Sequence, residues 1–319
     1  MKKSLLTLAL AATTLTSVAQ NLTFGIVTDI HTDIMHDGPR RLSTFLEAAE
    51  KNKVDFVIDL GDFTMVKDEN KPFVDIWKNY TGEKYNTLGN HDMDNCTKQE
   101  FMDFVGMKER YYSFTKGDVL FIVLDCNNLN NDGTYTPYAN ANFYIDASKR
   151  AWVDPEQVEW LKKEIQKEAK HCIIFSHQSL ENTVGNREQI QKMLEAENKR
   201  VGYTKIVASF SGHDHTDYHK VINGITYVQI NSASDQWVGD QYKCTTRFTE
   251  EDNKRRPALS LVVPYKDPLY AIVKMGKKSL KIKGIESEFV SPTPQELGIP
   301  EDLHPVPLTA KISDLTIKF

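Results

Sequence analysis

The sequence predicts an α/β fold, because short apolar segments alternate with amphipathic helical segments along most of the chain. The clearest strand, residues 54–62, is rich in Val and Ile and ends in Gly61-Asp62, as expected of a buried strand in a parallel sheet. An apolar strand at 22–29 precedes it, and an amphipathic helix at 39–51 lies between the two. A strand, a helix and a second strand in this order predict a βαβ unit.

The same alternation continues toward the C-terminus. We expect further strands at residues 85–88, 111–115, 119–125, 172–175, 205–208, 225–230, 269–274 and 279–285. We expect helices at 97–106, from 155 onward and around 188–197. The first of these helices opens with a Thr97-x-x-Glu100 capping box, and the second with Asp154-Pro155.

Residues 126–153 show no period and are rich in Asn, Gly, Asp and Tyr, so a long loop is expected there. Its aromatic residues, among them Tyr135 and Tyr144, favour an ordered loop. They could stack on a base or sugar of a ligand, or pack over the rim of a site. Packing is favoured, because large aromatic side chains need burial.

Composition describes an ordinary globular protein: 319 residues, 40% hydrophobic, 26% charged, with a formal charge of −5. No cluster of Lys and Arg appears in the sequence, so a nucleic-acid-binding surface is not expected. Residues 1–20 have two lysines, an apolar run and a small-residue exit, which predict a secretory signal peptide too short to span a membrane. We therefore expect an exported protein, periplasmic or secreted, without a membrane span.

The expected organisation is a signal peptide at 1–20, one α/β domain at 21–290 and a tail at 291–319 that packs on it. Export permits disulfides among Cys96, Cys126, Cys172 and Cys244, which allow three full pairings. Cys172 lies in an apolar run and is expected as a buried free thiol, whereas a bridge between Cys96 and Cys126 stays open. None of the four has zinc-ribbon spacing.

Ligand-type side chains follow five of the expected strands. They are Asp29 and His31, Asp62, Asn90 and His91, His177, and His213 and His215. A single histidine after a strand is more often a structural residue, but eight such residues at strand ends indicate a shared site, because ligands bind at the carboxyl edge of α/β sheets. Nitrogen and carboxylate donors favour zinc, manganese or iron over calcium.

These residues also resemble a known family. The segments Asp29-Ile30-His31, Gly61-Asp62, Gly89-Asn90-His91-Asp92, His177 and Gly212-His213-Asp214-His215 resemble, in order and spacing, the five blocks of the calcineurin-like metallophosphoesterases. The resemblance covers roughly residues 22–232. It implies a four-layer α/β/β/α sandwich with two mixed β-sheets, whereas the residues alone predict only an α/β fold with a metal site.

The resemblance further implies two divalent metal ions. Asp29, His31 and His215 would hold the first ion. Asn90, His177 and His213 would hold the second, and Asp62 would bridge the two. A hydroxide between the ions is the nucleophile this arrangement implies for attack on phosphorus.

His91 would contact the phosphate or donate a proton to the leaving oxygen. Asp92 is expected either to orient His91 through the other ring nitrogen or to be an acid at a helix start or on the surface.

One position departs from the purple acid phosphatases of this superfamily. They bind ferric iron through a tyrosine three residues after the bridging Asp, where this chain has Met65. A tyrosinate-bound ferric site is therefore not expected, and zinc, manganese or ferrous iron stay open. The leading hypothesis is a hydrolase of small phosphate mono- or diesters. The alternative is a non-catalytic metal-binding scaffold of the same fold, and the sequence does not indicate the oligomeric state.

Overall fold

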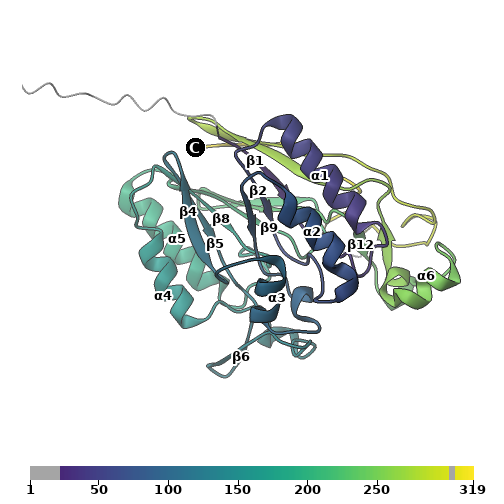
Figure 1. Cartoon of the computed structure of the whole chain (residues 1–319). Coiled ribbons are helices and arrows are strands. Elements are labelled where there is room, and N and C mark those ends of the chain that lie inside the picture. The colour runs from purple at the N-terminus through teal and green to yellow at the C-terminus, as the bar shows by residue number, and fades with distance from the viewer. Residues whose placement is uncertain (1–21, 302–305) are drawn as a thin grey trace, which may run out of the picture.

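Two six-stranded sheets pack face to face, with helices on both outer faces, in the computed structural model, which describes residues 22–301 and 306–319 (Figure 1). This arrangement is the four-layer α/β/β/α sandwich that the resemblance implied. The expected signal peptide at 1–20 lies outside the described residues. Within those residues no helix is long and apolar enough to cross a membrane.

The first sheet has the strand order β16-β15-β14-β1-β2-β3. Its strands are β1 (Leu22–Val27), β2 (Phe56–Asp59), β3 (Lys84–Asn86), β14 (Ala271–Met275), β15 (Ser279–Lys283) and β16 (Leu315–Lys318). The strands β1, β2 and β3 run parallel, and the other three pair antiparallel. The sheet is therefore mixed, and its edge strand β16 comes from the last residues of the chain.

The second sheet has the strand order β10-β11-β9-β8-β5-β4. Its strands are β4 (Tyr112–Lys116), β5 (Val119–Val123), β8 (His171–Phe175), β9 (Ile206–Ser211), β10 (Tyr218–Ile222) and β11 (Ile225–Gln229). The central strands β5, β8, β9 and β11 run parallel, and the two edge strands pair antiparallel. The strands expected at 111–115 and 119–125 are present as β4 and β5, which pair as a hairpin.

Aromatic side chains fill the space between the sheets. Phe24 and Phe56 of the first sheet stack with ring centroids 5.0 Å apart. Phe24 also meets Phe121 and Phe175 of the second sheet edge-on, at 5.7 Å and 6.0 Å. All four side chains are fully buried. Such pairs add about 0.5–1.5 kcal/mol each to the free energy gained by burying their area, so this layer fixes the two sheets against each other.

Five longer helices cover the outer faces: α1 (Gly38–Asn52), α2 (Lys71–Asn79) and α3 (Lys98–Val105) lie on the first sheet's side, and α4 (Pro155–Glu164) and α5 (Arg187–Val201) on the second's. A short helix, α6 (Glu250–Arg255), lies to one side of the sandwich (Figure 1). The capping box that the sequence predicts at Thr97 is present, since Thr97 and Glu100 exchange hydrogen bonds. The sequence analysis misses α2, whose short apolar stripe buries Phe73, Val74 and Trp77.

The expectation of a long loop at 126–153 is wrong in one part. Residues Asn128–Asn131 (β6) and Thr134–Pro137 (β7) form a hairpin. Its turn is Asp132-Gly133, with φ of 50° and 93°, a sequence that favours tight hairpin turns. The strands are polar and only partly buried, so they lack the alternating apolar pattern that identifies a strand.

A second two-stranded sheet pairs β12 (Asp235–Trp237) with β13 (Val262–Pro264) in a region where the sequence pattern is weak. It lies next to the site described below. The four cysteines are all buried free thiols, so Cys96 and Cys126 are not bridged.

Candidate metal centre

The five strand ends that carry the expected ligands converge at one edge of the sandwich. Backbone hydrogen bonds join the loops after the strands: Asp29 N donates to Gly61 O (2.9 Å), and Gly212 N donates to His177 O (3.0 Å). The first bond joins two loops that follow strands of the first sheet, and the second joins two loops that follow strands of the second sheet. The carboxyl ends of both parallel strand sets thus supply side chains to one place.

Asp29, His31 and His215 form one group of close donor atoms. Nε2 of His215 lies 3.3 Å from Oδ1 of Asp29 and 3.3 Å from Nε2 of His31. All three side chains are buried. Together they match the set implied for the first metal ion.

Asp62, His177 and His213 form a second group. Oδ2 of Asp62 lies 3.1 Å from Nε2 of His177, and Nδ1 of His213 lies 3.3 Å from the same nitrogen. Asn90 joins this group, because its Oδ1 lies 3.2 Å from Nε2 of His177. Oδ2 of Asp62 also lies 3.7 Å from Nε2 of His31, so one carboxylate oxygen faces both groups.

Hydrogen bonds to the outer ring nitrogens orient two of the histidines. Nδ1 of His177 lies 2.8 Å from the carbonyl oxygen of Leu60, and Nδ1 of His215 lies 2.9 Å from that of Asp235. A carbonyl only accepts, so in both rings Nδ1 donates, and Nε2 is the ring nitrogen that faces the site and would bind a metal ion there in place of a proton. The carboxylate of Asp235 is also close, with Oδ1 3.4 Å from the same ring nitrogen. Sequence reasoning missed Asp235, which precedes no recognised motif.

The donor set fits a metal ion on two observations. Oδ1 of Asp29 is buried without a hydrogen-bond donor of normal geometry among residues 22–301 and 306–319, although Oδ2 accepts from Thr28 and from the His213 amide. Nitrogen atoms of two histidines at 3.3 Å are at about the separation of two ligands bonded to one zinc ion at 2.0–2.1 Å.

Backbone strain concentrates at the same residues. Asp29, His31, Asp62, His213 and His215 all have positive φ, between 49° and 71°. Each such conformation costs a non-glycine residue of order 1 kcal/mol and is a feature of functional sites. The loops after the strands are therefore shaped to aim side chains, at a cost in stability.

Glycine is required where two of these loops touch. A Cβ built on Gly89 would lie 2.0 Å from the Asp62 amide nitrogen, and one on Gly212 would lie 2.5 Å from Oδ2 of Asp29. The glycines in the motifs around residues 89 and 212 thus serve close packing of one ligand loop against another.

Charge within the site is shared unevenly among the ionisable groups. Burial opposes ionisation of Asp62, but the neighbouring His177 and His91 hold the pKa of Asp62 well below its ordinary value. Burial likewise opposes protonation of His177, yet the Asp62 carboxylate raises the pKa of His177 to about 10. Asp62 is therefore favoured as a carboxylate and His177 as an imidazolium that pairs with it.

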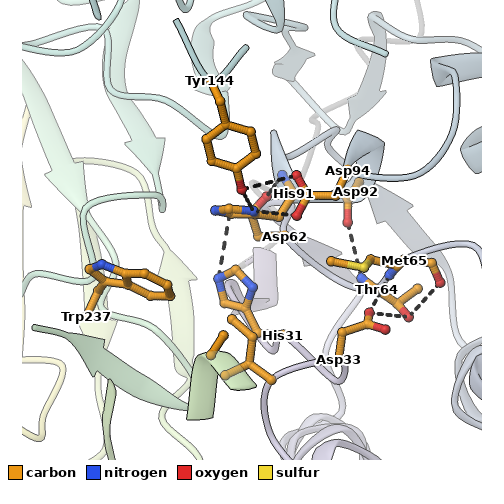
Figure 2. Close-up of a pocket in the computed structure, with 12 residues that line it drawn as sticks. His31, Asp33, Asp62, Thr64, Met65, His91, Asp92, Asp94, Tyr144 and Trp237 are labelled. Carbon is orange, nitrogen blue, oxygen red and sulfur yellow. Dashed lines mark hydrogen bonds and ion pairs between the residues drawn. The ribbon is translucent and has the colours of Figure 1, made fainter. Parts of the chain in front are cut away.

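His91 lies beside the metal ligands in a pocket of about 100 Å³ that also includes His31, Asp62 and Tyr144 (Figure 2). Its ring nitrogen Nδ1 lies 2.8 Å from Oδ2 of Asp94, and its backbone amide donates to Oδ1 of Asp62 (2.7 Å). Burial lowers the pKa of His91, but the carboxylates of Asp62 and Asp94 outweigh it and raise the pKa above its ordinary value. The protonated form of His91 is thus favoured more than that of an ordinary imidazole.

The carboxylate of Asp92 bonds to backbone amides and not to the ring of His91. Its Oδ1 accepts from the amides of Phe63 and Thr64, and its Oδ2 accepts from the amide of Gly89. Residues His91–Met93 form a 3-10 turn, in which side chains three apart share a face and adjacent ones do not. Asp94 therefore reaches the ring of His91, and Asp92 ties the Asp62 loop to the Asn90 loop.

The aromatic residues of segment 126–153 mostly pack, as expected, although one of them reaches the site. Tyr138 and Phe143 are buried and stacked, with ring centroids 4.8 Å apart. Tyr144 is 61% exposed, and its hydroxyl lies 3.4 Å from both Nδ1 of His91 and Oδ1 of Asp94. Figure 2 shows this hydroxyl pointing at the histidine and Asp94 from one side of the pocket.

Comparison with known proteins agrees with the fold. The structure is similar to a dimetal phosphatase from Danio rerio, with 12% identity, a TM-score of 0.57, and coverage of 85% of this chain and 99% of the other. It is also similar to GAP50, described as the anchor in the inner membrane complex of Plasmodium, with 14% identity, a TM-score of 0.50, and coverage of 85% and 88%. At these identities the likeness establishes the fold.

A search of curated proteins finds no match. The model of the calcineurin-like phosphoesterase family matches residues 22–217, which include every expected ligand. The chain therefore belongs to the calcineurin-like phosphoesterase family, whose members use divalent metal ions.

Proposed function

We propose that this protein is a dinuclear metal-dependent hydrolase of phosphate esters. The observation that carries the proposal is the position of Asp62 Oδ2, which lies 3.7 Å from Nε2 of His31 in one donor group and 3.1 Å from Nε2 of His177 in the other. A carboxylate oxygen between two donor groups suits a bridging ligand. Asp29, His31 and His215 would complete one metal site, and Asn90, His177 and His213 the other.

Two divalent ions held there supply the Lewis acidity that activates water and neutralises phosphate charge. His91 is the residue proposed to act on the leaving group. Asp94 holds Nδ1 of its ring, so the opposite nitrogen, Nε2, is free to give a proton to the departing ester oxygen. Asp92 supports the geometry through three backbone amides rather than by touching the reacting atoms.

Met65 supports zinc, manganese or ferrous iron as the metal. It lines the pocket at the position three residues after Asp62, where a tyrosine would be needed for the ferric site of purple acid phosphatases. A methionine thioether is a soft, uncharged group and gives ferric iron no anionic oxygen.

Export is the second part of the proposal and rests on the sequence of residues 1–20, with its lysines, apolar run and small-residue exit. N-terminal sequencing of the protein from its native host tests this part. A mature chain starting near residue 21 is expected, and an intact Met1 on the bulk of the protein would contradict export.

The experiment that tests the catalytic proposal is hydrolysis of p-nitrophenyl phosphate and bis-p-nitrophenyl phosphate by metal-stripped protein re-supplied with zinc, manganese or ferrous iron. Turnover should return with metal and be lost in Asp62→Asn. Asp267→Asn is the matched control, since Asp267 is an exposed carboxylate paired with Arg40 outside the site. Metal binding without turnover of any phosphate ester would favour the non-catalytic scaffold instead.

A further inference from the structure

Two cavities meet the candidate metal centre from different sides. The smaller, the pocket of about 100 Å³ that contains His91, is called the acid-side cavity here. The larger, of about 550 Å³, is lined by the ligands His213 and His215 together with Asn182, Tyr218 and Gln229, and is called the outer cavity. Trp237 lines both. A phosphoryl group at the metal centre would therefore have room for substituents on two sides.

The position of His91 and the volume of the outer cavity indicate where each substituent of the phosphoryl group would lie. The leaving group must face His91, because that residue is placed to protonate it, so it lies in the acid-side cavity. The volume of the outer cavity is within the range of pockets for small organic ligands. It suits a substituent that stays on phosphorus during the reaction.

The charges that line the outer cavity also favour an uncharged substituent there. Among the described residues that line the outer cavity, the charged side chains outside the metal ligands are two acids, Glu181 and Asp214. Lys220 pairs with Glu181 at 2.6 Å but is not among the residues that line the cavity.

A phosphate monoester has two negative charges, and its third unesterified oxygen would point toward this acidic lining. A diester has one charge and places an ester group there instead. Like charges in a partly buried site repel strongly, so the lining disfavours the dianion and any additional phosphate on the substituent.

Trp237 indicates what kind of substituent the outer cavity takes. Its side chain is 38% exposed at the junction of the two cavities, and Figure 2 shows it reaching the site from a different side than Tyr144. Strand β12 fixes it, because Gln236 and Trp237 pair with Val263 and Val262 of β13. An exposed, anchored indole offers a flat apolar surface on which a ring can stack.

We infer that the substrate is a phosphodiester whose retained substituent is an uncharged ring-bearing group, seated in the outer cavity against Trp237. This inference rests on the proposed function and specifies its substrate class. In the reaction, a water oxygen bonds to phosphorus and the bond from phosphorus to the leaving oxygen breaks. His91 gives that oxygen a proton, so the products are an alcohol and a phosphate monoester.

Non-hydrolysable ligands test the inference without turnover. Diphenylphosphinate has one charge and two rings, and phenylphosphonate has two charges and one ring. Calorimetric titration of the zinc-loaded protein should give at least tenfold tighter binding of diphenylphosphinate. Trp237→Ala should remove most of this difference, whereas Tyr203→Ala, which truncates an aromatic side chain 46% exposed and outside both cavities, should preserve it. Equal binding of the two ligands, or tighter binding of phenylphosphonate, would overturn the inference.

Hydrolysis provides the second arm, with three substrates that share the p-nitrophenol leaving group: the phenyl diester, the methyl diester and the monoester. The expected order of kcat/KM is phenyl diester, methyl diester, monoester, with at least tenfold between the first and last. Asn182→Trp, which fills the outer cavity from its exposed rim, should lower kcat/KM for the phenyl diester about tenfold and for the methyl diester much less.

The two arms separate this inference from the proposed function. A monoester preference with metal-dependent turnover would refute the diester inference and leave the phosphoesterase proposal intact. Loss of turnover on all three substrates in every metal would refute both.

Discussion

Oδ2 of Asp94 lies 2.8 Å from Nδ1 of His91, three residues earlier in the same turn. This contact holds the imidazole in the acid-side cavity and, together with Asp62, raises the pKa of His91 although burial opposes it. The sequence motif around residue 90 suggests Asp92 as the partner, but the geometry of the turn selects Asp94.

Replacing Asp94 should therefore impair the leaving-group step. Asp94→Asn keeps the shape but removes the charge that favours protonated His91, and kcat should fall about 10- to 100-fold, as for other residues that orient a catalytic histidine or metal ligand. The loss should be larger for phenyl than for p-nitrophenyl esters, because a poorer leaving group depends more on protonation. Steady-state kinetics on both esters measures this.

Asp103→Asn is the matched control for that variant, because Asp103 is an exposed carboxylate on α3 that accepts from Gln99. An equal loss on both leaving groups in Asp94→Asn would show that Asp94 serves folding rather than the position of His91.

A methyl group at Gly89 should displace the proposed bridging ligand. The added Cβ would meet the Asp62 amide at 2.0 Å and its Oδ1 at 2.3 Å, and backbone cannot yield as a flexible side chain can. Displacing a reacting group by about 1 Å can cost about 100-fold in rate, so Gly89→Ala should lose at least that much kcat. Gly276→Ala, where the nearest atom is 3.7 Å away, should retain full activity. Wild-type kinetics in Gly89→Ala would contradict the close packing described.

Asp235 should matter for metal affinity more than for stability. Its side chain is fully buried beside His215, and both carboxylate oxygens are without a hydrogen-bond partner within the described part of the chain. A buried carboxylate of this kind is stabilised by a nearby cation. Asp235→Asn should therefore weaken zinc binding about 10- to 100-fold and leave the metal-free protein at least as stable.

Competition with a fluorescent chelator measures the affinity, and urea unfolding of metal-free protein measures the stability. Asp240→Asn changes an exposed acid nearby and should alter neither. Unchanged zinc affinity in Asp235→Asn would argue against its part in orienting His215.

A buried ion pair beneath segment 126–153 predicts a pH-dependent stability. Burial opposes ionisation of Asp125, but the Lys98 ammonium at 2.5 Å and the Arg110 guanidinium at 3.1 Å hold the pKa of Asp125 below its ordinary value. A lowered folded-state pKa stabilises the protein above the unfolded-state pKa, near 4, and this contribution is lost as the pH falls through the folded-state value.

Lys98→Met removes the closer cation, so it should destabilise the protein at pH 7 by about 3 kcal/mol, as removing one member of a buried pair does. The difference from wild type should narrow toward pH 4, where the carboxyl of Asp125, left with Arg110 as its cationic partner, takes up a proton more readily than in wild type. Urea unfolding at both pH values gives the result, with exposed Lys108→Met as control. A difference that stays constant with pH would mean that packing of the lysine stem, rather than its charge, is what was lost.

Most of the scaffold could be predicted from the sequence, because the parallel strands are continuous apolar runs and the helices have clear stripes or caps. Strands β1, β2 and β8 and helices α1 and α3 are such cases. Several missed elements lack those signals. Helix α2 is short, and β6 and β7 are polar strands whose pairing depends on the Asp132-Gly133 turn. Tertiary contacts decide such segments, and local sequence does not report them.

The residues of the candidate site also fall into those that the sequence predicts and those that it does not. Residues after apolar strands, such as Asp62 and His177, could be identified because the strand pattern predicts where their side chains meet. Asp235 and Trp237 could not, because they lie on β12, a three-residue strand that reaches the site only through its pairing with β13, more than 20 residues later in the chain. Asp94 was missed for a local reason, since choosing between residues 92 and 94 requires knowing that the segment forms a 3-10 turn.

Metal stoichiometry tests the central claim most directly. Metal-stripped protein dialysed against zinc or manganese and analysed by inductively coupled plasma mass spectrometry should contain two ions per chain. Asp62→Asn should lower this number, because it alters the one carboxylate oxygen that faces both donor groups. A wild-type protein that binds one ion or none under conditions that saturate the site would contradict the two-metal account.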